Sequence, residues 1–246
     1  AGQDFTGFQW DNLLVESCLL ATCLPRRRAA PVAHTLLRLL LFKIYFESGI
    51  AKAQSYLGDW VDGSAMRFYY ETAPLPAWPG WYAHHLPELW HTIESWGALG
   101  LELGGAFLIL GPRRARLIAL VAFTTFQILN LATANYGYFV YLTLALHLFL
   151  LDDRDLDRWS RRLRHWNPFQ KHPQDPPPGL IVPNPWLPTA VRHFVFSVFA
   201  AGWLVGSLAT GIVHFSRPAP ASARIQSIER ATRPFRATNA YHLFGH

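Results

Sequence analysis

Several polar or charged side chains fall inside long apolar runs of this 246-residue chain. Such groups are costly in a hydrophobic layer and often mark a functional site there. A lysine without water can act as a base, and carboxylate, amide and imidazole groups can relay protons. The candidates for an intramembrane polar seam of this kind are Lys43, Glu47, Glu102, Gln127, Asn130 and His147.

Spacing alone leaves a structural role open for the same residues. Lys43 and Glu47 are four apart and could pair within one helix, which would keep the lysine protonated. Glu102 has no opposite charge near it in the sequence, so it needs a partner on another helix or must be protonated. Gly100 and Gly104 form a step of small residues that allows close helix approach. Interhelical hydrogen bonding is therefore the alternative to catalysis.

A second pattern with the spacing of metal ligands occurs at His84, Glu88 and His91. Pro87 interrupts the first turn, and the sequence offers no second ligand cluster. Phosphate-binding loops and the GxSxG serine motif are also missing from the sequence. We therefore expect interfacial histidines, no metal, no cofactor and no catalytic residue of a known motif.

The apolar runs that surround these residues have the length of membrane helices. Segment 191–215 is the clearest, and segment 10–24, with Asp11 and Glu16, is the weakest: it is either the inner half of a helix or a segment buried among others. Arg38 and Lys52 lie near the ends of their run, where long side chains can reach head groups. The sequence predicts an all-α, polytopic transmembrane helical bundle of about five to six membrane segments: 10–24, 33–53, 93–111, 116–132, 138–151 and 191–215.

The arginines predict how these segments are threaded. Three arginine-rich connectors alternate with connectors that contain few arginines or lysines, as expected for one side of a membrane. Membrane orientation also explains the net charge of +6 better than nucleic-acid binding does, so no nucleic acid is expected as a partner. The predicted cytoplasmic connectors are 25–28, 112–116 and 154–164, which leaves 54–92, 133–137 and the chain after 215 on the opposite side.

These assignments give a domain organisation. Residues 1–215 form the transmembrane helical domain, with an extracytoplasmic cap at 54–92 and a proline-rich cytoplasmic strap at 165–188. Residues 216–246 are expected to begin an extracytoplasmic C-terminal region that is cut short. The chain starts with Ala1 and ends without a terminating signal, so we expect a piece of a longer protein.

The predicted cap is rich in aromatic residues and prolines. Trp78 and Trp90 suit a membrane-interface belt, and Pro79 stiffens the path of the backbone. Exposed rings could serve either as a lipid belt or as a docking surface for another protein. The candidate docking residues are Tyr70, Glu71, Pro74, Pro76, Trp81, Tyr82, His84 and His85, of which Tyr70, Glu71, Trp81 and Tyr82 are expected to be exposed on one rim.

Several motifs without a regular repeat follow one another along the chain: FQWDNLLVE (8–16), FESGIAK (46–52), YYETAPLP (69–76), WYAHHLP (81–87), NYGYF (135–139) and LLDD (150–153). In these motifs the chain resembles the lipase maturation factor family, whose membrane part is related to the vitamin K-dependent carboxylase-like, or HTTM, transmembrane domains. The tail ATNAYHLFG (237–245) resembles the start of the family's extracytoplasmic region. The chain departs from the family at Tyr69, Ala73 and Val140, where His, Gln and Asn are usual.

The resemblance implies a multi-pass membrane protein that assists the folding and assembly of exported proteins such as lipases. Its partners would be the lipid bilayer and an exported hydrolase. Eukaryotic relatives reside in the endoplasmic reticulum membrane, and a bacterial member would reside in the inner membrane. Kinship with the carboxylase-like domains keeps an intramembrane enzyme, working through the polar seam, as the alternative function.

Overall fold

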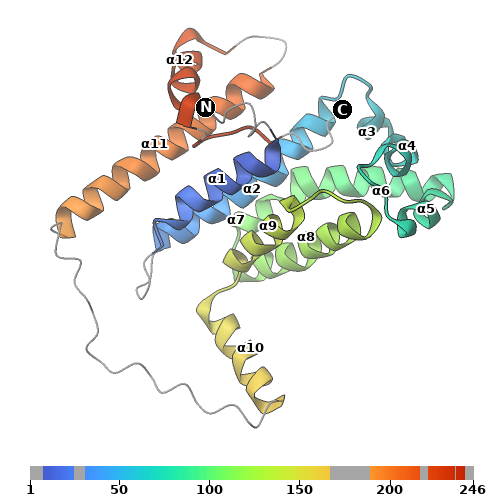
Figure 1. Ribbon diagram of the computed structural model, residues 1–246, viewed down its shortest axis with the longest axis horizontal. Helices are drawn as coiled ribbons and strands as arrows, with labels where there is room; N and C mark the ends of the chain where they lie inside the picture. Colours follow the sequence, from blue (N-terminus) through green and yellow to red (C-terminus); the bar gives the residue numbers. More distant parts are fainter. Residues whose placement is uncertain (1–7, 25–30, 167–188, 217–220, 236, 242–246) are drawn as a thin grey trace.

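The computed structural model describes residues 8–24, 31–166, 189–216, 221–235 and 237–241, and helices make up most of these ranges. No strand occurs within them, so the predicted all-α class is confirmed. Of the strap predicted at 165–188, residues 165 and 166 belong to a helix, and the rest, like the connector 25–28, falls outside the described residues. The bundle consists of α1 (Gln9–Ala21), α2 (Pro31–Ala53), α6 (Glu88–Gly100), α8 (Arg113–Thr133), α9 (Phe139–His147) and α11 (Thr189–Phe215) (Figure 1).

Shorter elements extend or join these helices. Helix α6 continues through a π-helical turn, η1 (Leu101–Gly105), into α7 (Phe107–Leu110), and α9 ends in the 3-10 turn η2 (Leu148–Leu150). The cap contains α3 (Asp59–Asp62), α4 (Ala65–Thr72) and α5 (Trp78–His84). Outside the bundle lie α10 (Asp153–Trp166), α12 (Ala223–Thr232) and η3 (Arg233–Phe235).

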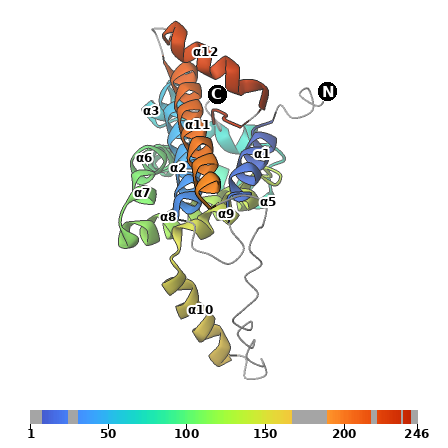
Figure 2. The same ribbon diagram turned by 90° about the vertical axis from the view of Figure 1, so that its left-hand side faces the viewer.

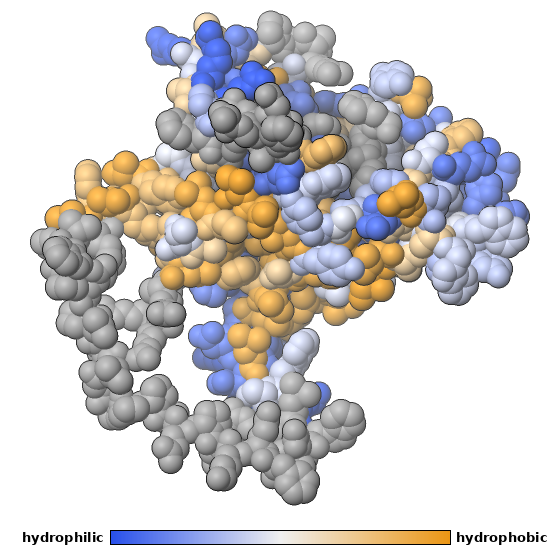
Figure 3. All heavy atoms as spheres, viewed as in Figure 1, coloured by the Kyte–Doolittle hydropathy of each residue, from blue (hydrophilic) through white to orange (hydrophobic). Residues whose placement is uncertain are grey.

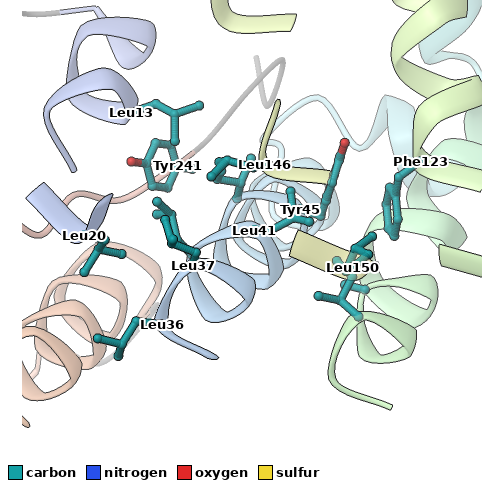
Figure 4. Close-up of a cluster of buried hydrophobic side chains, with 14 of the residues drawn as sticks. Leu13, Leu20, Leu36, Leu37, Leu41, Tyr45, Phe123, Leu146, Leu150 and Tyr241 are labelled. Atoms are coloured by element: carbon teal, nitrogen blue, oxygen red, sulfur yellow. The ribbon is translucent and has the colours of Figure 1, made fainter. Parts of the chain in front are cut away.

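Helix α2 is the centre of the bundle. It contacts α1 and α11 on one side and η1, α7 and α9 on the other. Because it is surrounded, most of its leucines are buried: Leu36, Leu37, Leu40 and Leu41 are at most 2% exposed. Figure 4 shows Leu37 and Leu41 of α2 within a cluster that also includes side chains of α1, α8 and α9.

Three stretches of the described chain are long and apolar enough to cross a membrane: Glu88–Leu110, Arg113–Thr133 and Phe194–Phe215. The other predicted segments differ in instructive ways. Helix α1 has 13 residues, Phe139–Leu150 is a shorter apolar helix, and α2 carries four charged residues along its length. Each of them has residues in the buried core, such as Leu13 of α1, Leu40 of α2 and Leu146 of α9.

Large apolar side chains lie exposed on the outer helices. Val121 of α8 and Leu208 of α11 are each 67% exposed, and Figure 3 shows a broad hydrophobic surface that includes α11. An apolar surface of this extent is unusual on a monomeric soluble protein. It is the surface expected where helices contact lipid.

An arginine–aspartate network closes one end of the bundle, which we call the arginine end. Arg116 holds both oxygens of Asp152 at 2.6 and 2.7 Å, and Arg113 makes a two-point contact with Asp155. Arg38 donates to the backbone oxygen of Phe149 at 2.8 Å, so it is anchored within the protein and does not simply extend to head groups. The Arg113 guanidinium holds the pKa of Asp155 below its usual range. This network fixes the start of α10 against α8.

Candidate functional site

The polar residues of α2 lie on two opposite sides of the helix. An α-helix makes one turn every 3.6 residues, which separates these residues into two groups. One side carries Tyr45, Ser48 and Lys52, and the opposite side carries Lys43 and Glu47. The predicted polar seam is therefore divided into two clusters that α2 separates.

The first cluster centres on Glu16 of α1, which is fully buried. Its Oε1 accepts a hydrogen bond from Trp203 Nε1 at 3.1 Å and lies 3.3 Å from Lys43 Nζ. Its Oε2 accepts hydrogen bonds from Asn239 Nδ2 at 3.1 Å and from the Tyr241 hydroxyl at 2.8 Å. One carboxylate thus joins α1, α2, α11 and the segment 237–241; we call this group the Glu16 cluster.

Glu47 belongs to the same cluster through the backbone of Tyr241. The Tyr241 N–H donates to Glu47 Oε2 at 2.8 Å, and the Tyr241 side chain is fully buried beside Leu13 and Leu37 (Figure 4). Lys43 lies 5.3 Å from the centre of the Tyr241 ring. The closest partners of Lys43 and Glu47 thus come from elsewhere in the chain and not from each other.

Close packing on α11 makes room for this arrangement. A Cβ atom on Gly211 would lie 2.9 Å from Glu47 Oε1, and one on Gly206 would lie 2.9 Å from the Thr238 methyl group. Ser207, between these glycines, lies 3.5 Å from Lys43 Nζ. Small residues at these positions let the segment 237–241 and α2 approach the same helix.

The second cluster contains an ion pair between Lys52 and Glu102. Lys52 Nζ lies 2.5 Å from both oxygens of Glu102, and these residues are only 1% and 3% exposed. The expected partner of Glu102 on another helix is confirmed, whereas the expectation that Lys52 reaches head groups is wrong. Its ammonium group also lies 4.9 Å from the centre of the Trp60 ring in α3.

The close approach that allows this pair depends on Gly49, a glycine outside the predicted contact. A Cβ atom on Gly49 of α2 would lie 3.1 Å from the backbone carbon of Glu102, so α2 and η1 nearly touch there. Gly100 and Gly104, predicted to form the contact, have no described atom within 4 Å of such a Cβ position. The π-helical turn shifts the register around Glu102, which spacing in a regular helix does not reveal.

Next to this ion pair, Tyr45 joins two members of the predicted seam. Its hydroxyl lies 2.8 Å from His147 Nε2 and accepts a hydrogen bond from Gln127 Nε2 at 3.0 Å. The other ring nitrogen of His147 lies 3.0 Å from the hydroxyl of Thr124. Tyr45 is not among the residues predicted from the sequence, because a tyrosine in an apolar run has the same pattern as any other core aromatic residue.

Glu102 borders a small cavity of about 20 Å³. That volume suits one or two water molecules and no larger substrate. The lining residues, which include Asn130, come from α2, η1, α8 and the chain from 136 to 140: Tyr45, Ser48, Glu102, Phe126, Gln127, Asn130, Tyr136, Phe139 and Val140.

At the opposite end from the arginines, the cap is built on a buried tyrosine. Tyr70 of α4 is only 7% exposed and donates its hydroxyl hydrogen to Glu94 of α6 at 3.0 Å. Burial, together with the nearby Glu94 carboxylate, raises the pKa of Tyr70. The prediction that Tyr70 is exposed on the rim is therefore wrong. Its side chain faces α6, inside the cap.

Backbone hydrogen bonds fasten the cap to the end of α8. Asn135 N donates to the carbonyl oxygen of Pro74, and Ala77 N donates to that of Thr133, each at 3.0 Å. A Cβ atom on Gly80 would lie 2.8 Å from the Thr133 oxygen, so α5 approaches α8 more closely than a larger residue would allow. Two distant connectors therefore form one packed unit.

The outer side of α5 carries exposed rings, which we call the cap surface: Trp78, Trp81, Tyr82 and His85. Trp81 and Tyr82 are both 61% exposed, and their ring centres are 5.1 Å apart. His85 Nδ1 lies 2.7 Å from the Trp81 oxygen. In Figure 1, α5 lies at the outer edge of the cap, away from α1 and α11.

The other candidate residues of the cap take separate partners. Glu71 lies 3.3 Å from His84, Glu88 lies 3.3 Å from Arg67, and His91 Nε2 lies 3.2 Å from the backbone oxygen of His84. Among the described residues, no group of three His, Cys, Asp or Glu side chains is placed to hold a metal ion. Pro74 and Pro76 are exposed and flank Leu75.

The three positions at which the sequence departs from the resembled pattern lie close together. Ala73 and Val140 belong to one small apolar cluster with Ala134 and Tyr136, and Tyr69 packs against it. The hydroxyl groups of Tyr69 and Tyr136 share a hydrogen bond. The departures thus fall together at one contact between the cap and the bundle.

Comparison with known proteins adds the family. The sequence model of the lipase maturation factor transmembrane domain matches residues 1–158. The chain belongs to the lipase maturation factor family. Over 173 residues it is 39% identical to lipase maturation factor 2 of Rattus norvegicus, covering 63% of this chain and 25% of the relative. The human lipase maturation factor 2 is 36% identical over 174 residues, with the same two shares.

Human lipase maturation factor 1 is more distant. It is 30% identical over 167 residues, which cover 63% of this chain and 29% of the relative. This lipase maturation factor chain thus spans about a quarter of the length of the curated relatives it matches, and no solved structure matches it. Together with the three apolar helices, the family domain makes the chain an integral membrane protein.

Proposed function

We propose that the chain is the membrane part of a factor that assists the maturation of exported lipases or related hydrolases, and that its cap surface contacts the client. The names of the relatives support the activity. The observation that carries the proposal is the exposure of Trp78, Trp81 and Tyr82 on a helix whose backbone is fastened to α8. Rigid, exposed aromatic rings supply contact area at low entropic cost.

Backbone geometry near these rings gives further support. Leu75 has a φ of 43° and is 77% exposed. Leucine rarely adopts this left-handed conformation, and strained residues concentrate at sites where the strain serves a function. An apolar side chain held outward in this way extends the proposed docking surface beyond α5.

The arrangement of charge supports an extracytoplasmic cap. Arg38, Arg113 and Arg116 lie together at the end of the bundle opposite the cap, as the positive-inside rule requires of a cytoplasmic end. Under this orientation the cap faces the lumen of the endoplasmic reticulum in a eukaryotic cell or the periplasm in a bacterial one. Both are compartments that exported hydrolases enter.

The interior gives less support to an intramembrane reaction. Lys43 and Glu47 lie on the side of α2 opposite to the cavity beside Glu102. That cavity has a volume of only about 20 Å³. Each charged residue of the predicted seam has a partner. Lys43 and Glu102 form ion pairs, and Glu47 accepts a hydrogen bond from a backbone N–H. Folding assistance at the cap is therefore the function that the geometry favours.

A maturation assay with the full-length protein tests this proposal. Cells that lack the endogenous factor would produce it together with a secreted lipase, and the activity per amount of secreted lipase would be measured. The double substitution Trp81→Ala/Tyr82→Ala removes the centre of the cap surface. Because a few aromatic residues dominate most interfaces, we expect the yield of active lipase to fall by about tenfold.

Tyr141→Ala serves as the matched control, since Tyr141 of α9 is also 60% exposed but lies outside the cap surface. A photo-crosslinking residue placed at position 82 should capture the lipase, and one at position 141 should not. Unchanged lipase yield in the double variant, together with no crosslink from position 82, would show that the rings contact only lipid.

A further inference from the structure

Helix α10 leaves the bundle at the arginine end and runs crosswise to α2 and α11, projecting to one side (Figures 1 and 2). Its position along the bundle is fixed by the contact between Arg113 and Asp155. Arg113 is also the first residue of the apolar helix Arg113–Thr133, which is long enough to cross a membrane. The start of α10 therefore lies at the level of the membrane boundary, and its direction follows the plane of the bilayer.

One side of α10 carries exposed apolar residues. Leu156 is 48% exposed and Trp159 is 54% exposed, and their spacing of three places them on the same side of the helix. Val121 of α8, on a helix long and apolar enough to cross a membrane, is exposed to a similar or greater degree.

The other side of α10 carries arginines. Arg154, Arg158 and Arg161 are exposed and fall opposite Leu156 at 3.6 residues per turn. Residues 153–166 contain five arginines and three aspartates, and one of these aspartates is already paired with Arg113. In Figure 3, hydrophilic atoms lie along the left-hand side of α10, and hydrophobic atoms continue onto it from the bundle.

This distribution of apolar and basic residues favours the membrane surface as the partner of α10. Leucine and tryptophan on one side and arginine on the other are the composition of helices that lie in a membrane interface. Positive charge at that level complements the phosphate groups of anionic lipids, which attract juxtamembrane arginines. A membrane interface requires α10 to lie at the level where the membrane-spanning helices begin, whereas a soluble protein partner does not.

We propose that α10 binds the bilayer surface as an interfacial helix, with Leu156 and Trp159 among the acyl chains and Arg158 and Arg161 on anionic lipid head groups. The helix then anchors the arginine end at a fixed depth.

Spin labelling of the whole chain in lipid nanodiscs tests the proposal. With Cys18→Ala and Cys23→Ala as the background, a nitroxide would be attached to single cysteines introduced at Leu156, Arg158, Trp159, Ser160 and Arg161. Electron paramagnetic resonance then compares access of oxygen, which dissolves in lipid, with access of a nickel chelate, which stays in water. Labels at Val121 and at Arg224 of α12 supply the lipid and water references.

We expect oxygen access to dominate at positions 156 and 159 and nickel access at 158 and 161, with a period of 3.6 residues. Five positions carry the profile, so one variant that fails to fold leaves it readable. Nickel access at every position, in nanodiscs that contain anionic lipid, would overturn the proposal and leave α10 free for a soluble partner.

The lipid charge is tested by a second comparison. The double variant Arg158→Gln/Arg161→Gln should lose the difference in depth between nanodiscs with and without anionic lipid, whereas Arg224→Gln/Arg230→Gln on α12 should keep it. A periodic profile that never responds to lipid charge would overturn the role of the arginines. Neither result depends on the cap, so failure here is distinct from failure of the proposed function.

Discussion

The interior around α2 and the cap surface differ in how their unusual residues are used. Inside, Glu16, Glu47 and Glu102 each bind a group from a distant part of the chain, and water reaches them little. On the cap, Trp81 and Tyr82 remain more than half exposed although the backbone beneath them is firmly held. The comparison teaches that the costly polar groups here stabilise the bundle, while the surface available for recognition is aromatic.

The two interior clusters also join different parts of the protein. The pair of Lys52 and Glu102 lies wholly within residues 1–158, the part that matches the family domain. The Glu16 cluster connects that part to Trp203, Asn239 and Tyr241, which lie beyond it. The segment 237–241, expected to begin an extracytoplasmic region, is therefore held inside the bundle.

The largest effect expected in this comparison comes from breaking the ion pair in the interior. Lys52→Met leaves the Glu102 carboxylate buried without its counter-charge, which costs roughly 3–5 kcal/mol in buried pairs of this kind. We expect the free energy of unfolding to fall by that amount. Reversible unfolding in mixed detergent and SDS micelles measures it.

Removing both charges separates a structural pair from a catalytic one. In Lys52→Met/Glu102→Leu no charge is left unpaired, so most of the lost stability should return. Lipase maturation should return with it. Restored stability without restored maturation would give the pair a direct role in activity and would contradict the distinction between interior and cap.

An intermediate effect is expected for the segment that enters the bundle. Tyr241→Phe removes one hydrogen bond to a charged group but keeps the ring in place, so we expect a loss of about 1–2 kcal/mol. Tyr141→Phe, at a position that is 60% exposed, is the control and should have no measurable effect on unfolding. Equal stability of both variants would mean that the Glu16 cluster does not hold the segment.

Local patterns in the sequence were enough to predict the helical membrane bundle. Runs of apolar residues and arginine-rich connectors are visible over about 20 residues, the length that a bilayer imposes. The glutamate in the apolar run 10–24 was also a visible signal, and burial among other helices was one of the alternatives considered for that run. The sequence could not show which residues Glu16 binds.

Contacts between distant segments depend on how each helix is rotated and how deep it lies. Glu16 and Tyr241 are 225 positions apart, and no spacing rule links them. A five-residue π-helical turn changes which side of the chain Glu102 occupies, so its neighbours could not be read from regular helical spacing. Tyr70 illustrates the same difficulty in the cap, because the side of α4 that faces α6 is decided by packing and not by the ring itself.

The smallest stability effect is expected on the cap surface, and it is the most informative. Trp81→Ala/Tyr82→Ala removes rings that are 61% exposed and leaves the hydrogen bonds of Pro74 and Ala77 intact, so the free energy of unfolding should change by no more than about 0.5 kcal/mol. Tyr70→Phe, which removes the hydrogen bond from the buried Tyr70 hydroxyl to the partly buried Glu94 carboxylate, should cost more than this double change. If the double variant instead lost stability as Tyr70→Phe does, the rings would be part of the packed core of the cap. Their exposure could then no longer be attributed to a client.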